Sequence, residues 1–254
     1  MLSAITRAVS PSINQCELSC IARDPIDYER AVEQHKKYEG CLRELGVSVV
    51  SLSAEPELPD SMFVEDPAVV VDEVAVITRM GAESRRGESE SVAATLAKFR
   101  PLRRMRGPAT LEGGDVLRIG TDVYVGLSAR TNREGIAQLT AELEPFGYKV
   151  HTVEIRGCLH LKSASTYVGN DTVLLNGEWI DKNIFRGLRI IDVPRNEPRA
   201  ANALAIGNTV LLPAVFPATA ELLVKRGFNV RTLDISELMK AEAGLTCSSI
   251  LFET

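Results

Sequence analysis

The feature that most constrains the fold is a recurring pattern in which a helix ends at a glycine and an alternating strand follows. It is clear around Gly46, Gly147 and Gly227, and weaker after a helix expected over 90–99 and around Gly187. Glycine suits the left-handed backbone position just past a helix. The strands begin about 54, 47, 40 and 40 residues apart, which is typical of an array of supersecondary units. Five such units fill the chain.

Each unit continues from a short polar motif into two strand-like runs separated by a turn. The motif-plus-strand pieces are FVEDPAVVVDEVAVIT, LEGGDVLRIGTDVYVG, HLKSASTYVGNDTVLL, AANALAIGNTVLLP and, last in the sequence, TCSSILF. Amphipathic helices are expected after Asp27 and after Thr131 or Asn132, which are residue types that cap helices. The expected hairpin turns are Asp72-Glu73, Gly120-Thr121, Gly169-Asn170 and Gly207-Asn208.

A unit of this kind has an apolar face that it cannot bury alone. We therefore expect residues 1–254 to form a single α/β domain in which five units surround a common axis, with the helices outside. An ordinary α/β domain whose units resemble one another incidentally explains the spacing about equally well. Closure around an axis would have a chemical consequence, because it would bring polar motifs from distant parts of the chain together.

Charge and hydropathy exclude several classes of partner. The chain has 29 Lys and Arg against 34 Asp and Glu, a formal net charge of −5, so a nucleic-acid partner is not expected. No apolar run approaches the roughly 18 residues of a membrane-spanning helix, and the first residues lack the pattern of a secretory signal. We expect a cytoplasmic protein with no membrane partner.

The five cysteines indicate reduced thiols, because their spacing is irregular and a chain of this length needs no disulfide framework. Cys16 and Cys20 have no second pair, and Cys158 with His160 lacks further ligands at a regular interval. Structural zinc sites require four such ligands. We therefore expect no bound metal.

Cys247 and His160 are the candidates for covalent chemistry. Cys247 stands at the start of an apolar strand, where a cysteine taken alone is most often a small buried side chain. It becomes a good nucleophile only as the thiolate, which needs a nearby cation or base. His160 could be that base or a general acid, although a hydrogen-bonded core histidine is commoner. His35 and His151 fit less well, because they lie in an amphipathic helix and in an alternating strand.

Several carboxylates would surround the thiol if the units close around an axis. Such a site would repel anions and favour a planar cation that offers two N–H groups at once. A guanidinium is such a cation, and its charge would lower the pKa of the thiol. Taken singly, each acid is more often a solvated turn residue. The four candidates are Asp60, Glu65, Asp66 and Glu112.

Arginines near two of the motifs supply the other half of a recognition pattern. Arg79, Arg85 and Arg86 lie in TRMGAESRRGE, and Arg130 lies in LSARTN. A guanidinium fork suits a carboxylate at the far end of a substrate, although most surface arginines have no such role. An acidic centre with a basic rim matches an amino acid that itself carries a guanidinium.

Together these motifs resemble the dimethylarginine dimethylaminohydrolases of the guanidine-modifying, or pentein, superfamily. The resemblance covers nearly the whole chain, through EQHKKYEGCL, LPDSMFVEDPAVV, VITRMGAESRRGE, TLEGGDVL, YVGLSARTN, LHLKS, AAN and DISELMKAEAGLTCSSIL. It implies a five-fold pseudosymmetric α/β propeller of ββαβ-type repeats with an active site on the axis. It also implies hydrolysis of dimethyl- and monomethyl-L-arginine to L-citrulline and an alkylamine. The reaction would pass through a cysteine S-alkylthiouronium intermediate without metal or organic cofactor.

The resemblance assigns a role to each matching residue. Cys247 of GLTCSS corresponds to the nucleophile, His160 of LHLKS to the proton donor, and Glu112 of LEGGD to an acidic position that is Asp in some members. The segment around Leu18 is the poorest match and has an expected lid role. The assigned binding residues are Asp60, Glu65 and Asp66 for the guanidinium, Arg85 and Arg130 for the substrate carboxylate, and the backbone carbonyls of Leu18 and Ala241 for the substrate amine.

Other functions stay open at this point. Arginine deiminase, citrulline hydrolase and amidinotransferase belong to the same superfamily, although the FVEDP motif and the lack of an inserted helical domain favour dimethylarginine. A non-catalytic binding module on the same fold is disfavoured, because Cys247, His160 and Glu112 are all present. A zinc hydrolase is a third hypothesis. A homodimer through an exposed edge or helix face is compatible with the sequence.

Overall fold

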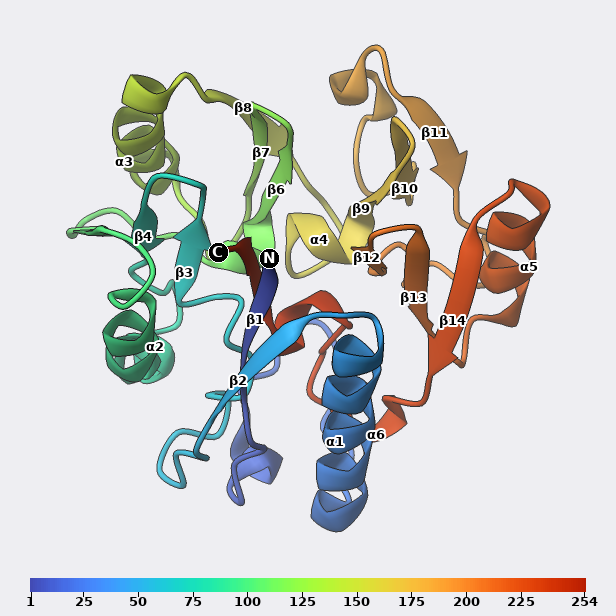
Figure 1. Cartoon of the computed structure of the whole chain (residues 1–254), viewed down its shortest axis with the longest axis horizontal. Helices are drawn as coiled ribbons and strands as arrows, with labels where there is room; N and C mark the ends of the chain where they lie inside the picture. The colour runs from blue at the N-terminus through green and yellow to red at the C-terminus, as the bar shows by residue number, and fades with distance from the viewer.

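Five three-stranded sheets surround the centre of the computed structural model, which describes all 254 residues, and helices lie outside them (Figure 1). No helix is long and apolar enough to cross a bilayer. The sheets contain β15 (Ile250–Glu253), β1 (Leu2–Arg7) and β2 (Ser48–Leu52); β3 (Ala68–Val70), β4 (Ala75–Ile77) and β5 (Leu102–Arg104); β6 (Val116–Ile119), β7 (Asp122–Leu127) and β8 (Lys149–Glu154); β9 (Ser165–Gly169), β10 (Thr172–Leu175) and β11 (Arg189–Asp192); and β12 (Leu204–Ile206), β13 (Thr209–Pro213) and β14 (Asn229–Leu233).

Every sheet has the same internal order, an antiparallel pair followed by a parallel strand. In the third sheet β7 pairs with β6 antiparallel and with β8 parallel. A parallel pair needs a crossover, which is usually a helix. The crossovers contain α1 (Tyr28–Glu44), α2 (Ser89–Leu96), α3 (Arg133–Leu143), α5 (Pro217–Lys225) and, in the fourth unit, only the 3-10 turn η5 (Lys182–Phe185). This is the five-fold pseudosymmetric α/β propeller that the sequence predicts.

One of the five sheets is built from both ends of the chain. β15 pairs antiparallel with β1, with Leu2 opposite Glu253 and Ile5 opposite Ile250, and β2 completes the sheet on the other side of β1. The backbone N–H of Thr254 also donates to the carbonyl of Met1 at 2.8 Å. Both termini therefore lie near the centre in Figure 1, and the ring is closed by strand pairing.

The expected helix boundaries follow from local chemistry. Asp27 caps α1 by accepting the N–H of Arg30 at 3.1 Å, and Asn132 caps α3 by accepting the N–H of Gly135 at 2.8 Å. Gly147, after α3, has a φ of +87°, which an L side chain rarely adopts. These contacts confirm the predicted starts and ends.

Two expectations about local structure are wrong. The turn between β9 and β10 is formed by Asn170 and Asp171, with φ of 49° and 50°, and not by Gly169 and Asn170. A two-residue hairpin of type I′ needs positive φ at both central positions, which Asn and Asp tolerate. The helix expected over 90–99 ends at Leu96, and Phe99 instead packs against Phe252 with ring centroids 5.1 Å apart.

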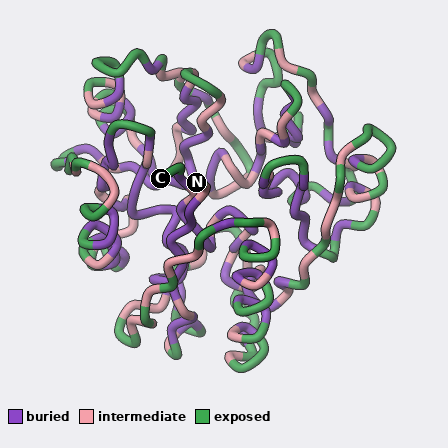
Figure 2. The backbone as a smooth tube through the Cα atoms, in the orientation of Figure 1, coloured by how far each residue is buried: buried purple, intermediate pink, exposed green.

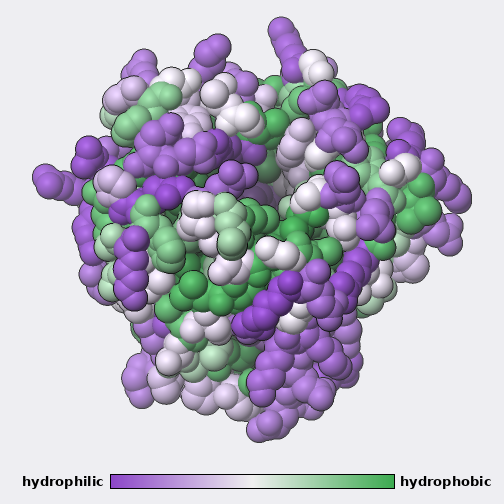
Figure 3. All heavy atoms as spheres, viewed as in Figure 1, coloured by the Kyte–Doolittle hydropathy of each residue, from purple (hydrophilic) through white to green (hydrophobic).

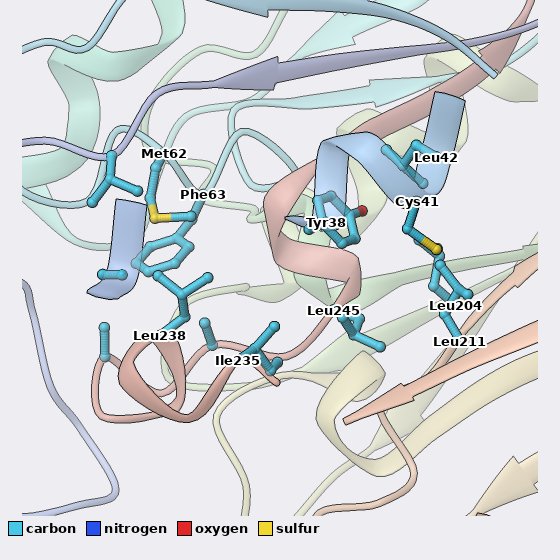
Figure 4. Close-up of a cluster of buried hydrophobic side chains, with 14 of the residues drawn as sticks. Tyr38, Cys41, Leu42, Met62, Phe63, Leu204, Leu211, Ile235, Leu238 and Leu245 are labelled. Atoms are coloured by element: carbon cyan, nitrogen blue, oxygen red, sulfur yellow. The ribbon is translucent and has the colours of Figure 1, made fainter. Parts of the chain in front are cut away.

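Buried apolar side chains form separate clusters between neighbouring units, and the buried parts of the chain lie mainly on the strands and on the inner faces of the helices (Figure 2). The largest cluster joins α1 to the C-terminal segment, including α6 (Ser236–Met239) (Figure 4). Leu42, Leu238 and Leu245 belong to this cluster and are at most 1% exposed. Burying each such side chain stabilises the fold by about 2 kcal/mol. This packing fixes the segment that carries Cys247.

A cavity of about 530 Å³ lies on the axis, lined by the first strands of the sheets. Leu2 and Glu253 belong to its lining, so it opens near the two chain ends. Figure 3 shows this face, where hydrophobic side chains gather around the centre and hydrophilic ones around the rim. Glu65, Lys162 and Thr246 also line the cavity. These three polar residues are shared with the site described next.

Candidate active site

The polar motifs lie at equivalent places in the units, just before the first strand of each hairpin. Asp66 precedes β3 and Glu112 precedes β6, while His160 precedes the short helix α4 (Leu161–Ala164) that leads into β9. Cys247 lies in the 3-10 turn η6 (Thr246–Ser248) before β15. Because the sheets surround one axis, these positions converge at the centre.

His160 and Glu112 form the first contact of the site. The distance from His160 Nε2 to Glu112 Oε2 is 2.8 Å, and the Glu112 side chain is completely buried. The other carboxylate oxygen, Oε1, accepts the backbone N–H of Gly81 at 3.1 Å and of Ala82 at 3.3 Å. Glu112 therefore holds the imidazole in a fixed orientation.

Asp66 lies on the other side of the imidazole. Its Oδ1 is 4.0 Å from His160 Nδ1 and accepts the backbone N–H of Gly114 at 2.9 Å. A Cβ at Gly114 would lie 2.5 Å from His160 Nδ1 and 2.8 Å from Asp66 Oδ1. The second glycine of LEGGD is thus required by the close approach of these two side chains.

Arg85 and Arg130 are both buried, and both contact the acidic cluster. Arg85 donates to Asp66 Oδ2 at 2.8 Å and makes a two-fold pair with Glu88, at 3.1 and 2.9 Å. Arg130 donates to Glu112 Oε1 at 3.3 Å and to the hydroxyl of Ser19 at 2.9 Å. Sequence reasoning missed Glu88. Its position three residues after Arg85, on one turn of helix, is the signal that could have found it.

Cys247 contacts the same cluster through its backbone and its sulfur. Its carbonyl accepts the N–H of Glu65 at 3.3 Å, and its Sγ accepts the N–H of Gly244 at 3.4 Å. The Glu65 carboxylate is held by Lys162 Nζ at 2.5 Å and by the Thr246 hydroxyl at 2.8 Å. Lys162 and Thr246 were also missed, although each lies within two residues of a predicted catalytic residue.

The segment around Leu18 is attached to the site by hydrogen bonds. Asp60 Oδ2 accepts the N–H of Glu17 at 3.0 Å, and the Glu242 carboxylate accepts the N–H of Ser19 at 2.8 Å. Ala241, the neighbour of Glu242, is 6% exposed. The structure therefore brings the segments of Leu18 and Ala241 together beside the acidic cluster. All ten predicted residues lie in this region.

The His160 imidazolium and the Glu112 carboxylate stabilise each other's charged forms. Burial disfavours the imidazolium, but Asp66, Asp115 and Glu112 outweigh it and raise the pKa of His160 to about 9. Burial likewise disfavours the Glu112 carboxylate, but the hydrogen bond and charge of His160, with Arg85, hold its pKa well below the usual range. At neutral pH the pair is therefore a proton-bearing imidazolium and a carboxylate.

The thiol has the opposite tendency. Burial, together with the charges of Glu65 and Asp66, raises the pKa of Cys247 to about 12. Burial also raises the pKa of Glu65 and of Asp60, despite the lysine or arginine near each. Without a ligand the sulfur is protonated at neutral pH. A cation placed among these carboxylates would favour the thiolate.

The donor atoms of Asp66, Glu112 and His160 lie within 4.8 Å of one another, as metal ligands do. Arg85 and the imidazolium already neutralise these carboxylates, at 2.8 Å for each pair. A metal ion would have to displace both contacts. The contact between His160 and Glu112 suits proton transfer.

Comparison with known proteins places these observations in a family. A family profile described as "N,N dimethylarginine dimethylhydrolase, eukaryotic" matches residues 6–234. The N(G),N(G)-dimethylarginine dimethylaminohydrolase of Pseudomonas aeruginosa is 39% identical over 228 residues, 89% of this chain and 90% of the relative. The protein of that name from Streptomyces coelicolor is 38% identical over 97% of this chain and 95% of its own.

A solved structure gives the same result in three dimensions. It is the Pseudomonas aeruginosa enzyme, with a serine in place of a cysteine, complexed with citrulline. It superposes with a TM-score of 0.94 and 36% identity, covering 98% of each chain. On this evidence the chain belongs to the dimethylarginine dimethylaminohydrolase family, within the pentein superfamily.

Proposed function

We propose that this protein hydrolyses the dimethylated and monomethylated guanidinium of L-arginine derivatives to L-citrulline and an alkylamine. The observation that carries the proposal is a thiol beside Glu65 and Asp66, in a site where His160 is held as a proton donor by Glu112. The names of the relatives and the citrulline bound to a similar structure support it. Family membership makes the non-catalytic module and the zinc hydrolase poorer explanations.

Substrate binding follows from the charges of the site. The guanidinium lies between Asp66 and Glu112, with Asp60 and Glu65 adding negative charge. Arg85 and Arg130, which donate to Asp66 and Glu112 in the free protein, each donate a hydrogen bond to the substrate carboxylate when it binds. The backbone carbonyls of Leu18 and Ala241 accept hydrogen bonds from the α-amino group of the substrate. The cationic guanidinium offsets the charges that hold the thiol protonated, and so assists formation of the nucleophile.

The chemistry proceeds by addition and elimination at one carbon. The bound guanidinium favours ionisation of Cys247, whose thiol gives its proton to solvent. The thiolate Sγ then forms a bond to the central guanidinium carbon as a C–N π bond opens, which gives a tetrahedral adduct. The bond from this carbon to the alkylated nitrogen then breaks, His160 gives that nitrogen its proton, and an amine leaves with an S-alkylthiouronium behind it. His160 next takes a proton from water, which adds to the same carbon. Collapse of this adduct breaks the C–S bond, the leaving thiolate takes up the proton that the hydroxyl group loses, and citrulline is released. No step needs a metal or an organic cofactor.

The direct test is substitution of the nucleophile with a citrulline readout. Cys247→Ala and Cys247→Ser are expected to fold and to lose turnover by at least about 10⁴-fold, because no other side chain supplies the attacking atom. Cys41→Ala removes a buried thiol of α1 and serves as a matched control that keeps its activity. Full activity in Cys247→Ala would overturn the proposal.

A second assay separates this function from its nearest rivals. Dimethylarginine, monomethylarginine, arginine and citrulline are offered side by side, and the released amine is identified. Release of dimethylamine and methylamine is expected. Release of ammonia from arginine alone would indicate an arginine deiminase instead.

Location and assembly belong to the same proposal. Five free cysteines support a reducing cytoplasm. A homodimer would use exposed apolar side chains such as Val215 and Val224, which are 49% and 58% exposed beside and on α5. Cell fractionation and light scattering of the purified protein test these two points. A purely extracellular pool, or a mass of one chain at all concentrations, would contradict them.

A further inference from the structure

The unit that contains β12 supplies no group to the proposed reaction, although each of the other four does. Asp66, Glu112, His160 and Cys247 come from the units of β3, β6, β9 and β15. The corresponding place in the remaining unit, just before β12, is occupied by Asn202 of the AAN motif.

The Asn202 side chain contacts the two segments that carry the proposed nucleophile and proton donor. Its Nδ2 donates to the carbonyl of Lys162 at 3.0 Å and to the hydroxyl of Thr246 at 3.0 Å. Its Oδ1 accepts the N–H of Thr246 at 3.2 Å. Lys162 is two residues after His160, and Thr246 directly precedes Cys247. One buried amide thus bridges the two segments.

These contacts are part of a closed network. The Thr246 hydroxyl, which accepts from Asn202, donates to Glu65 Oε2 at 2.8 Å. The other oxygen of Glu65 pairs with Lys162 Nζ. The backbone carbonyl of Lys162 accepts the hydrogen bond from Asn202 Nδ2, which closes the network. Both donor hydrogens of the amide and one lone pair of its oxygen are used. A side chain that can only donate or only accept hydrogen bonds cannot complete the network.

The same amide lies against the backbone that supports the sulfur. A Cβ at Gly244 would be 2.2 Å from Asn202 Cγ and Oδ1, so the two groups are in tight contact. Gly244 donates its N–H to Cys247 Sγ at 3.4 Å. A shift of Asn202 would therefore move this N–H as well as Thr246.

We propose that Asn202 is a positioning residue, which fixes the segment of Cys247 relative to that of His160. The inference rests on the proposed function and extends it, since it names the residue that sets the relative placement of the two reacting groups. Misplacement of reacting atoms by about 1 Å can lower a rate by about 10²-fold. Asn202 contacts neither Arg85 nor Arg130, so it has no part in holding the substrate carboxylate.

The test compares Asn202→Ala and Asn202→Asp with the native protein. We expect kcat for dimethylarginine to fall at least about 30-fold in both, with KM changed less than about threefold. The aspartate keeps the shape of the amide but has no donor for Lys162 or Thr246. A role in packing alone would spare Asn202→Asp, whereas a hydrogen-bonding role would not.

The matched control is Asn176→Ala. Asn176 is equally buried and donates to the carbonyl of Pro198 at 3.0 Å while accepting the N–H of Glu178 at 2.9 Å. Its side chain makes no hydrogen bond to the site, and the backbone N–H that it donates to Ala164 is kept in the variant. Its kcat should therefore stay within about twofold of native even where the melting temperature falls. An equal loss of kcat in Asn176→Ala would show that the loss follows stability, and would overturn the proposal.

A substrate-free arm separates this inference from the proposed function. The rate at which iodoacetamide alkylates Cys247 is measured against pH in native protein and Asn202→Ala. Loss of the Gly244 donor would raise the pKa of Cys247 further, so the variant should be alkylated more slowly than native protein at every pH measured. If native protein shows no turnover, the function fails, while the alkylation arm still tests Asn202. An unchanged alkylation profile, or kcat within twofold of native in both variants, overturns the inference, as does failure of every Asn202 variant to fold.

Discussion

At the scale of single residues, the site depends on a buried imidazolium that its neighbours keep charged. His160 has a pKa of about 9 because Asp66, Asp115 and Glu112 outweigh its burial. A raised pKa means that the charged form is present below this value and is lost as the pH rises through it. In the proposed mechanism the same imidazolium gives up the proton that the leaving nitrogen needs. Proton donation and site electrostatics thus share one titration.

Activity should therefore fall on the alkaline side. We expect kcat for dimethylarginine, measured with the cation bound and the thiolate already favoured, to decrease about tenfold per pH unit above about pH 9 in the native protein. In Glu112→Gln the amide supports the imidazolium less, so this alkaline limb should move toward neutral pH. A pH–rate profile of both proteins checks the prediction. An alkaline limb that does not move in Glu112→Gln would contradict it.

The space beside the imidazole gives a second residue-scale prediction. Gly114→Ala places a methyl group 2.5 Å from His160 Nδ1, so we expect kcat to fall by about 10²-fold. Gly40→Ala in α1 is the control, because nothing lies within 4 Å of its Cβ and alanine favours a helix by about 0.5–1 kcal/mol. Steady-state kinetics and thermal melting of both variants test the pair. Native kinetics in Gly114→Ala would refute the packing argument.

Sequence alone predicted the central residues of the site but not their supports. Cys247, His160 and the acids were identifiable because their chemistry is unusual at such positions and because a family pattern passes through them. Glu88 and Glu242 act through contacts that depend on how a loop and a turn fold back on the site. Asn202 lies in a motif that was recognised, but an amide has no distinctive chemistry until its partners from two other units are known.

At the scale of elements, helix starts depend on few hydrogen bonds. Asn132 accepts the N–H of both Gly135 and Thr110, at 2.8 and 3.0 Å, and donates to Pro108 at 3.1 Å. Asp27 accepts only the N–H of Arg30 in its role as cap. Asn132 therefore ties α3 to the preceding loop, while Asp27 supports one helix end.

The two caps should differ in their effect on stability. We expect Asn132→Ala to lower the free energy of unfolding by about 2 kcal/mol and Asp27→Ala by about 1 kcal/mol. Urea unfolding of both variants gives the comparison. A larger loss in Asp27→Ala than in Asn132→Ala would contradict the assignment of contacts.

The elements were predictable where a local signal exists. Caps and terminal glycines marked α1, α3 and α5, since these signals act within one turn. The fourth unit was harder, because η5 makes its crossover without an α-helix and the turn after β9 uses Asn170 and Asp171. The pairing of β1 with β15 has no local signal, because the two strands are separated by the whole chain.

At the scale of the whole molecule, this pairing closes the ring. Ile250 and Phe252 are each 6% exposed, and their burial together contributes several kcal/mol. Removing residues 250–254 should abolish cooperative unfolding and activity, whereas removing Thr254 alone should leave both. Thermal unfolding followed by circular dichroism measures the difference. A stable, active protein without 250–254 would show that closure is unnecessary.

Closure also predicts tolerance of a circular permutation. Joining Thr254 to Met1 through a short glycine–serine linker and opening the chain between Asp72 and Glu73 keeps all five sheets. Our interpretation of residues 1–254 as one domain predicts one unfolding transition and native turnover. Two separate transitions would contradict a single domain.

The most direct test of the whole account is to trap the reaction intermediate. Turnover of dimethylarginine is quenched with acid within the first cycle, and the digested protein is mapped by mass spectrometry. The account predicts an amidino-amino-acid adduct on the peptide that contains Cys247, and none in Cys247→Ser. An adduct on another residue, or full turnover with an unmodified Cys247 throughout, would contradict it.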